Sequence, residues 1–571
     1  MHRKTLYIIA ALVVAIVVVA AVALVALTAP PPASILVVGT TEVEETLDPA
    51  DAYNYFSVNM LQNTMSTLLT YKETGDGTLV PMLLTEVPTV ANGGVANGGL
   101  NYTLHLRTGA TFQDGTPINA TTVKYSIDRS VKAKLDPISG KKAIPVPSFL
   151  LDPIKGANAY FTAYTGLVDD PANWTQAQVD SAWANYTAQG VEVVNPTTVK
   201  IHMGRVWSPM NLLLAFTSLA PVNPNVYLMD KFNPSALNIS SSGPYRVAAF
   251  KSGERVEFVR NPTFFGTPAV MEKVVIKFYK DAPALSLSLQ SGEIDVAYRN
   301  LNPEDYNNLA KNTNFIAQQG ASAVIRYIVF NARDPPFNDV LLRRALAYAI
   351  DRTSIVQTAF LNSTEPLYSL VPRGMFGHQD IFKTRYAKNI ATAQALLTQA
   401  GYSTTTKLTF DFYYTPTRYG TTEADVATLV KQAWEATGMV SVTLKSQEWL
   451  TYRQSFKQGL FSAFLLGWFP DYLDPDNYVT PFLHWASGGT NSFGSFYKNL
   501  TLDSLIELQA TQGIDSTQRA TTLGQIQNAL ADDVPYLPMW QTTQQVVYKK
   551  SVSGVILDAS QFFRYFTIKV G

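Results

Sequence analysis

The chain has 571 residues, more than one compact core usually holds, so its length predicts two or three domains. Charged residues make up 15% of the chain and the formal net charge is zero, which gives no electrostatic case for nucleic-acid binding, since that needs a basic face. The sequence contains no cysteine, which excludes disulfides, thiol nucleophiles, Cys-ligated metal sites and a lipid anchor on an N-terminal cysteine.

The N-terminus predicts a helix that crosses a membrane once. Residues 5–29 are uncharged, and a helix of that length spans roughly 37 Å, against a hydrocarbon core of about 30 Å. His2, Arg3 and Lys4 precede it, which places the N-terminus in the cytoplasm and the remainder outside the cell membrane. The alternative is a cleaved signal peptide, whose apolar part is usually about 7–15 residues long. Under either interpretation, residues 1–33 form an anchor or signal followed by a proline spacer.

Glycosylation sequons recur along the exported part. Asn-x-Ser/Thr occurs seven times, at Asn101, Asn119, Asn173, Asn185, Asn238, Asn362 and Asn499. Together with the export signal, these sequons predict surface glycosylation and are more typical of an archaeal or eukaryotic surface than of a bacterial one.

In the first half of the exported chain, hydrophobic periodicity predicts strands separated by helices. The predicted strands cover residues 34–41, 100–106, 191–194, 199–203, 256–259 and 274–278. Helices are predicted over 56–70 and 119–131, whereas residues 132–190 have the Pro, Gly and Asn content of irregular structure.

The second half alternates more regularly. The predicted helices cover residues 343–359, 391–400, 423–437 and 449–458. The predicted strands cover residues 408–414, 440–444 and 461–468, the last of which is apolar apart from Ser462 and is therefore expected to be buried. This alternation predicts an α/β protein with two lobes, each built on a sheet.

Several short motifs now resemble one family in the same order along the chain. They are LDPA at 47–50, LTY at 69–71, YTLHLR at 102–107, FQDGTP at 112–117, ATTV at 120–123, DR at 128–129, GPY at 243–245, RNP at 260–262, GEID at 292–295, FN at 330–331, PFND at 336–339, RRA at 343–345, AIDR at 349–352, GW at 467–468, DP at 474–475 and PYLP at 535–538. The chain is similar in these segments to the family 5 solute-binding proteins, which serve oligopeptide and dipeptide ABC importers. The resemblance runs from about residue 35 to the end.

The resemblance implies a type II periplasmic-binding-protein-like fold with an extra domain. Lobe I would comprise residues 34–75, 214–325 and 535–571, the extra domain residues 76–213, and lobe II residues 326–534. A solute would lie between the hinged lobes, and the closed receptor, expected to be a monomer, would deliver it to ABC permease subunits in the membrane.

The segment 464–474, which ends the buried strand, carries the main candidate site. Asp471 follows Trp468 closely, and a carboxylate at the end of a strand can hold an ammonium group by a charge-assisted hydrogen bond. The resemblance implies that Asp471 holds the α-amino group of a peptide and that Trp468 forms a wall beside it. The alternatives are a loop carboxylate that caps the chain and a tryptophan packed in the core; Asp474, before Pro475, is expected to form a turn.

A second candidate region follows the opening turn, where Tyr53, Asn54, Tyr55 and Phe56 have side chains able to contact a peptide or stack on a sugar. The resemblance implies that this loop lies on the rim of the cleft. Loop packing alone is the alternative. Trp449 precedes a helix and is also a candidate. So is Tyr414, because either it or Tyr413 points inward on an alternating strand.

One departure from the family pattern concerns the ligand carboxylate. Some relatives place a basic residue shortly before the tryptophan, whereas no basic residue lies between Lys457 and Asp471. Carboxylate capture therefore falls to residues such as Arg418 or Arg453, or the ligand has no carboxylate.

No enzyme signature is present. The sequence lacks a phosphate-binding P-loop, a Gly-x-Ser-x-Gly elbow and a His-Glu-x-x-His site, and its five histidines lack metal-ligand spacing. No cofactor or metal is expected. Three functions stay open: a peptide-binding importer subunit, an oligosaccharide receptor of the same family, and a structural or sensory surface protein that reuses the fold.

Overall fold

The structure is a computed structural model that describes residues 34–571, apart from residues 43–45, 138–139, 236, 238, 417, 421, 486–488 and 558. The predicted membrane helix at residues 5–29 and the sequon at Asn238 lie outside the described residues. Across the described part of the chain, no helix combines the length and apolar character needed to cross a bilayer.

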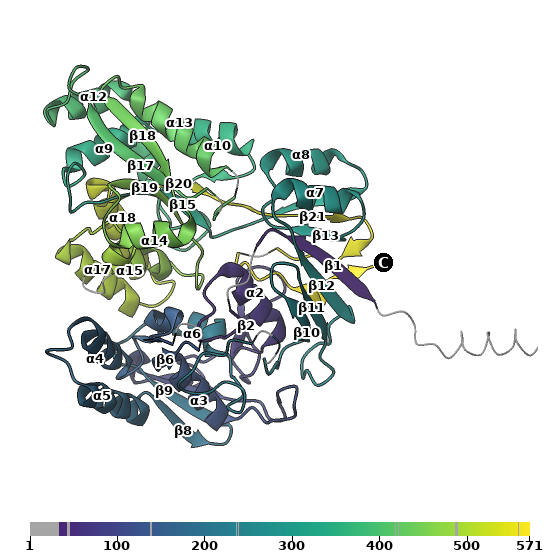
Figure 1. Cartoon of the computed structure of the whole chain (residues 1–571). Helices are drawn as coiled ribbons and strands as arrows, with labels where there is room; N and C mark the ends of the chain where they lie inside the picture. The colour runs from purple at the N-terminus through teal and green to yellow at the C-terminus, as the bar shows by residue number, and fades with distance from the viewer. Residues whose placement is uncertain are drawn as a thin grey trace, which may run out of the picture.

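Lobe I, at the right of Figure 1, is built on a seven-stranded mixed sheet with the order β10-β11-β12-β1-β13-β21-β14. Its strands are β1 (Ile35–Thr40), β10 (Tyr245–Lys251), β11 (Arg255–Arg260), β12 (Lys273–Phe278), β13 (Val296–Tyr298), β14 (Phe315–Gly320) and β21 (Gln544–Lys549). Its helices are α2 (Tyr55–Thr64), α7 (Ala282–Gln290) and α8 (Pro303–Lys311). The predicted first strand is thus confirmed as β1, and the predicted helix over 56–70 is confirmed but ends at Thr64.

The extra domain, at the bottom of Figure 1, has a four-stranded sheet with the order β4-β5-β9-β8. Its strands are β4 (Val95–Ala96), β5 (Asn101–His105), β8 (Val191–Asn195) and β9 (Thr198–His202). Its helices are α3 (Ala120–Val131), α4 (Ala157–Asp169), α5 (Gln176–Gln189) and α6 (Met210–Leu213). Short strand pairs border the lobes: β2 (Leu69–Tyr71) with β3 (Leu79–Pro81), β6 (Lys134–Leu135) with β7 (Lys142–Ala143), and β22 (Val552–Ser553) with β23 (Lys569–Val570).

Lobe II, at the top left of Figure 1, has a six-stranded sheet with the order β16-β20-β15-β19-β17-β18. Its strands are β15 (Ile325–Phe330), β16 (Glu365–Pro366), β17 (Leu408–Tyr414), β18 (Val440–Ser446), β19 (Ala463–Trp468) and β20 (Tyr536–Gln541). Its helices are α9 (Val340–Ala349), α10 (Arg352–Phe360), α11 (Ile381–Arg385), α12 (Ile390–Gln399), α13 (Glu423–Glu435), α14 (Trp449–Lys457), α15 (Asp476–Leu483), α16 (Gly489–Ser492), α17 (Leu500–Thr511) and α18 (Thr517–Asp533).

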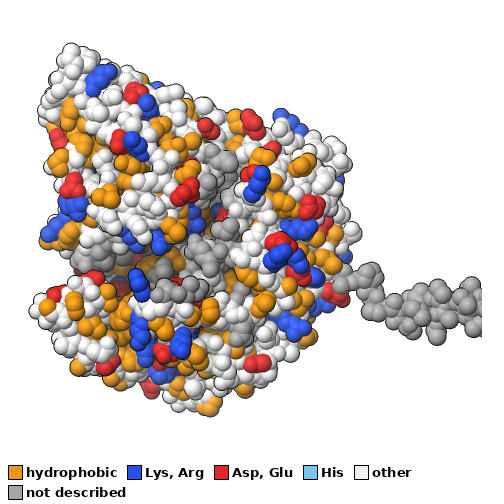
Figure 2. Space-filling model, in the orientation of Figure 1, with side chains coloured by type: hydrophobic (Ala, Val, Ile, Leu, Met, Phe, Trp, Pro, Cys, Tyr) orange, Lys and Arg blue, Asp and Glu red, His pale blue; other side chains and the backbone are white. Residues whose placement is uncertain are grey.

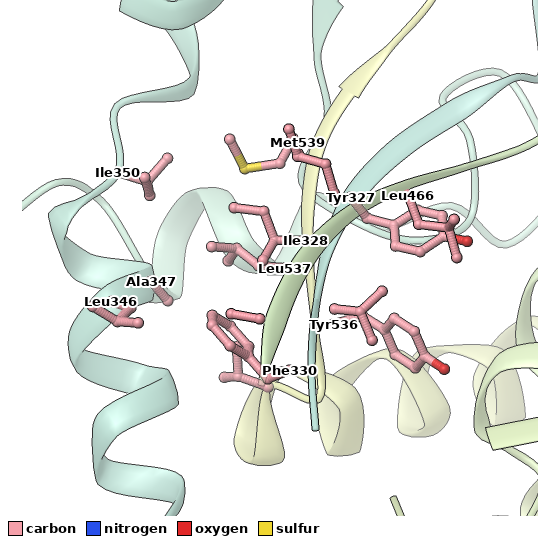
Figure 3. Packing of buried hydrophobic residues seen from close by; sticks show 14 of the residues in the cluster. Tyr327, Ile328, Phe330, Leu346, Ala347, Ile350, Leu466, Tyr536, Leu537 and Met539 are labelled. Atoms are coloured by element: carbon pink, nitrogen blue, oxygen red, sulfur yellow. The ribbon is translucent and has the colours of Figure 1, made fainter. Parts of the chain in front are cut away.

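The central strands of lobe II are buried on both faces. Along β15, Ile328 and Phe330 point toward α9, whereas Tyr327 points to the opposite face (Figure 3). This alternation follows from the two-residue period of a strand. Because every residue of β15 and of β19 is buried, these strands fix the position of the loop that follows β19.

The chain passes from lobe I to lobe II at residues 321–324 and returns at residues 542–543. The two passages lie side by side, because the Thr542 amide donates a hydrogen bond of 3.0 Å to the Val324 carbonyl. The return point differs from the predicted boundary at residue 535, because β20 completes the sheet of lobe II before the chain leaves it.

Two of the sequence motifs meet in a buried ion pair. Arg129 of α3 donates to both carboxylate oxygens of Asp48, at 2.7 and 2.6 Å, and the two side chains are 1% and 0% exposed. Bidentate pairing of this kind is both strong and directional. It joins the opening turn of lobe I to the extra domain.

Two predictions about helices were wrong. The predicted helix over 343–359 is two helices, α9 and α10, because Asp351 caps α10 by accepting the Ser354 amide at 3.1 Å. Residues 132–190 contain α4 and α5 rather than only irregular structure. α5 begins with a capping box in which Thr175 and Gln178 satisfy each other's backbone amides.

Candidate functional site

Two adjoining cavities lie where the lobes and the extra domain meet. Cavity 1, of about 150 Å³, lies between lobe I and lobe II, and cavity 2, of about 60 Å³, lies between the start of α2, residues 212–216 and residues 469–473. Tyr55, Phe469 and Gln561 line both cavities, so the two are neighbours. In the space-filling view, the surface is hollowed between lobe II above and the extra domain below (Figure 2).

Asp471 lines cavity 2 and is held by Asn477 of α15. The Asn477 side chain accepts the Asp471 amide at 2.9 Å and donates to the Asp471 carboxylate at 2.9 Å. It also accepts the indole N–H of Trp468 at 3.0 Å. Since Asn477 is fully buried, it fixes both the loop and the direction of the carboxylate.

The environment of Asp471 favours a cation from outside the protein. Burial raises the pKa of this carboxyl to about 6, although the hydrogen bond from Asn477 and the nearby Tyr53 hydroxyl lower it. Within the described residues, no Lys, Arg or His forms an ion pair with Asp471, and it is the only charged residue lining cavity 2. An ammonium group that binds beside a desolvated carboxylate of this kind stabilises its charged form.

The opening loop contributes the opposite wall of cavity 2. Tyr53 and Asn54 both line this cavity, and the Asn54 side chain also caps α2 by accepting the Ser57 amide at 2.7 Å. Burial raises the pKa of Tyr53 well above its ordinary value, and the neighbouring Asp471 raises it further. The loop therefore places a protonated phenol next to the carboxylate.

Cavity 1 is lined by a stack of rings and guanidinium groups that crosses from lobe I to lobe II. The Arg299 guanidinium lies 3.9 Å from the centroid of the Tyr55 ring and 5.1 Å from that of Phe469. Phe469 in turn stacks on Tyr419, at 6.4 Å and 11°. The Arg326 guanidinium lies 3.7 Å from the Tyr419 centroid. Because Arg299 and Tyr55 belong to lobe I and the other three to lobe II, the stack links the two lobes.

The remaining predicted residues lie apart from the cavity walls. Trp468 is 8% exposed and packs edge-on against Phe482, and Phe56 is 3% exposed in the core of lobe I. Trp449 begins α14 and packs against Tyr419, with ring centroids 5.9 Å apart. Tyr414 ends β17, where its carbonyl accepts the Gln447 amide. The structure therefore brings Asp471, Tyr53 and Asn54 together and places Trp468, Phe56, Trp449 and Tyr414 behind or beside the cavities.

Of the two arginines considered for carboxylate capture, Arg418 lines cavity 1 and stacks 5.0 Å from the Trp449 ring, whereas Arg453 is exposed on α14. Asp474 was expected to form a turn, and it does cap the chain by accepting the Asp476 amide at 2.8 Å. It also forms a buried bidentate ion pair with Arg519 of α18.

Sequence reasoning missed Phe469, Arg299, Arg326 and Asn477. Phe469 directly follows Trp468, and consecutive residues of an extended chain point to opposite sides, so this neighbour could have been considered. Arg299 and Arg326 carried no motif, because only the three-dimensional arrangement brings them to the cavity. In the part of the chain that is described, no group of three His, Cys, Asp or Glu side chains could hold a metal ion.

Comparisons with known proteins agree with this architecture. Residues 78–490 match the sequence profile of the bacterial extracellular solute-binding proteins, family 5 Middle. The chain is 26% identical over 485 residues to the periplasmic oligopeptide-binding protein OppA of Salmonella typhimurium, covering 83% of each chain. It is 24% identical over 528 residues to the probable D,D-dipeptide-binding periplasmic protein DdpA of Escherichia coli, covering 92% of each.

Among solved structures, the fold matches the ABC transporter-associated periplasmic binding protein DppA from Helicobacter pylori in complex with the peptide STSA. The TM-score is 0.76 at 20% identity, with 94% of this chain and 98% of that chain covered. The predicted periplasmic-binding-protein-like fold is therefore confirmed. The prediction that the chain is not an enzyme is confirmed as well, since proteins of the matched family bind solutes rather than transform them. The chain thus belongs to family 5 of the extracellular solute-binding proteins.

Proposed function

We propose that this chain is the substrate-binding subunit of an ABC importer, and that it binds peptides between lobes I and II and delivers them to the permease. The observation that carries the proposal is Asp471, a partly buried carboxylate in cavity 2 that has no ion-pair partner among the described residues. Its place next to Tyr53 and Asn54, at the junction of both lobes, suits the α-ammonium group of a peptide. Relatives named as oligopeptide- and dipeptide-binding proteins support the proposal.

Peptide binding is tested by isothermal titration calorimetry with a tripeptide pool, the same pool acetylated at its N-termini, and a maltooligosaccharide pool. We expect the unmodified pool to bind and acetylation to weaken binding at least tenfold, because it removes the ammonium group. Asp471→Asn should weaken binding of the unmodified pool by a similar factor and leave the acetylated pool unchanged. Tighter binding of the sugars than of the peptides would overturn the proposal and favour an oligosaccharide receptor, which could use the aromatic rings that line cavity 1.

We also propose that residues 5–29 anchor the receptor in the cell membrane, with the lobes outside. The uncharged stretch behind His2, Arg3 and Lys4 supports an anchor, and Asn173, Asn185 and Asn362 are exposed sequons where glycans could be attached in an archaeal or eukaryotic host. In membrane fractions from the native host, an uncleaved N-terminal peptide should be found by mass spectrometry and protease added to whole cells should digest the lobes. A mature N-terminus after residue 29 would show instead that the segment is a cleaved signal.

A further inference from the structure

Among the described residues, the side chains that line cavity 1 include more arginines than carboxylates. Three guanidinium groups line it, those of Arg299, Arg326 and Arg418, against one carboxylate, that of Glu42. Arg326 is committed to Glu423 in a buried ion pair, with side chains 3% and 1% exposed. Arg299 lies beside Glu42. Cavity 2 has the opposite sign, since Asp471 is the only charged residue among the described residues that line it.

The Arg299 guanidinium has a hydrogen-bond donor that could bind an anion. It packs against both the Tyr55 and the Phe469 ring, and its side chain is 15% exposed. Its Nη1 atom is buried and donates no hydrogen bond to the described part of the chain. The Glu42 carboxylate lies 3.5 Å from Nη1, beyond the usual N–H···O range of about 2.7–3.2 Å. A buried donor without an acceptor is unfavourable, so an anion that reached Nη1 would be bound favourably.

Glu42 also fixes the loop that carries Arg299. The Asn300 side chain donates to Glu42 at 2.9 Å. Arg299 and Asn300 both have left-handed backbone angles, with φ values of 71° and 64°, and this conformation is disfavoured for arginine. Glu42 therefore holds the loop in place and at the same time offers Arg299 a carboxylate at the end of cavity 1.

We infer that Arg299 binds the anionic end of the solute and that Glu42 competes with that end for the guanidinium. The inference rests on the proposed peptide function, under which the anionic end is the C-terminal carboxylate and the ammonium group lies at Asp471. The aromatic rings of Tyr55 and Phe469, which line both cavities, would then flank the peptide between its two charged ends. Arg299 is thus a specificity-determining residue for peptides with a free C-terminus.

The inference is tested by competition. The purified chain is mixed with a random tripeptide library that contains equal amounts of peptides with free and with amidated C-termini. The captured peptides are then released, identified and quantified by mass spectrometry. The wild type should capture free acids in at least tenfold excess over amides. Arg299→Gln should capture both forms about equally, Arg299→Lys should restore part of the excess, and Glu42→Gln should raise it about threefold or more.

The possible outcomes of this experiment distinguish a wrong inference from a wrong proposed function. Equal capture of acids and amides by the wild type would overturn the inference and leave the proposed function intact. Equal loss of both forms in Arg299→Gln would assign Arg299 a structural role and would also overturn it. A library amidated at the C-terminus but enriched in Asp and Glu tests whether a side-chain carboxylate is read instead; capture of that library at the level of the free acids would overturn the assignment to the C-terminus. Capture of no peptide at all would overturn both the proposed function and the inference.

Discussion

Asp474→Ala is expected to lower the free energy of unfolding by about 3–5 kcal/mol, because it leaves Arg519 buried without its partner. The Arg519 guanidinium is 0% exposed and donates to Asp474 Oδ2 at 2.8 Å, with a second bond from Nη2 to Oδ1. Chemical denaturation with urea measures the change. The loss should also weaken peptide binding, since Asp474 anchors the loop that carries Asp471.

Glu254→Ala is the matched control for this prediction, because it removes the same type of group from an exposed ion pair. Lys251 and Glu254 have side chains 66% and 46% exposed, and solvent screens pairs of this kind, so Glu254→Ala should lower the free energy of unfolding far less than Asp474→Ala. A loss below about 1.5 kcal/mol for Asp474→Ala would contradict the assigned role of the pair.

Peptide affinity is expected to fall about a hundredfold between pH 7 and pH 4, because protonation of Asp471 removes the charge that attracts the ammonium group. The pKa of about 6 places the start of this loss near pH 6. Below that point affinity should decrease by about tenfold per pH unit. Calorimetric titrations across the range measure it, and the Asp471→Asn variant should show a weak affinity that is nearly independent of pH.

The stability of the free protein should respond to pH in the opposite direction. Burial raises the pKa of Asp471 from 3.8 to about 6, so between these values the folded state holds a proton that the unfolded state has lost. Stability therefore falls as pH rises from about 4 to 6, by at most about 3 kcal/mol, and stays low above pH 6. The difference between wild type and Asp471→Asn isolates this contribution from other carboxyls. A difference that does not change across this range would contradict the burial assigned to Asp471.

The residues that sequence reasoning could find are those whose local pattern already implies their place. The apolar segment that forms β19 was predicted to be buried, and an acid shortly after such a strand was predicted to lie just beyond the end of that strand. Asp471 was identified for this reason, and Tyr53 and Asn54 followed from the resemblance of the opening loop. Their contact across the junction of lobe I and lobe II is what the structure adds.

The residues that sequence reasoning missed depend on distant pairings. Arg326 reaches cavity 1 because β15 pairs with β19, which places it opposite Gly467. Arg299 reaches the same cavity from the loop after β13, through a left-handed backbone that no sequence period reveals. Helix α5 was missed because the Pro, Gly and Asn content of its surroundings outweighed the capping box at Thr175.

The paired passages at residues 321–324 and 542–543 form a narrow two-stranded strap between lobe I and lobe II. A narrow strap of this kind lets lobe II move relative to lobe I as a rigid body. Because the chain contains no cysteine, single cysteines at Leu287 and Leu361, which are 67% and 44% exposed on opposite sides of the strap, would be unique attachment points for a dye pair. The protein is thus suited to conversion into a fluorescent sensor of the solute that it binds.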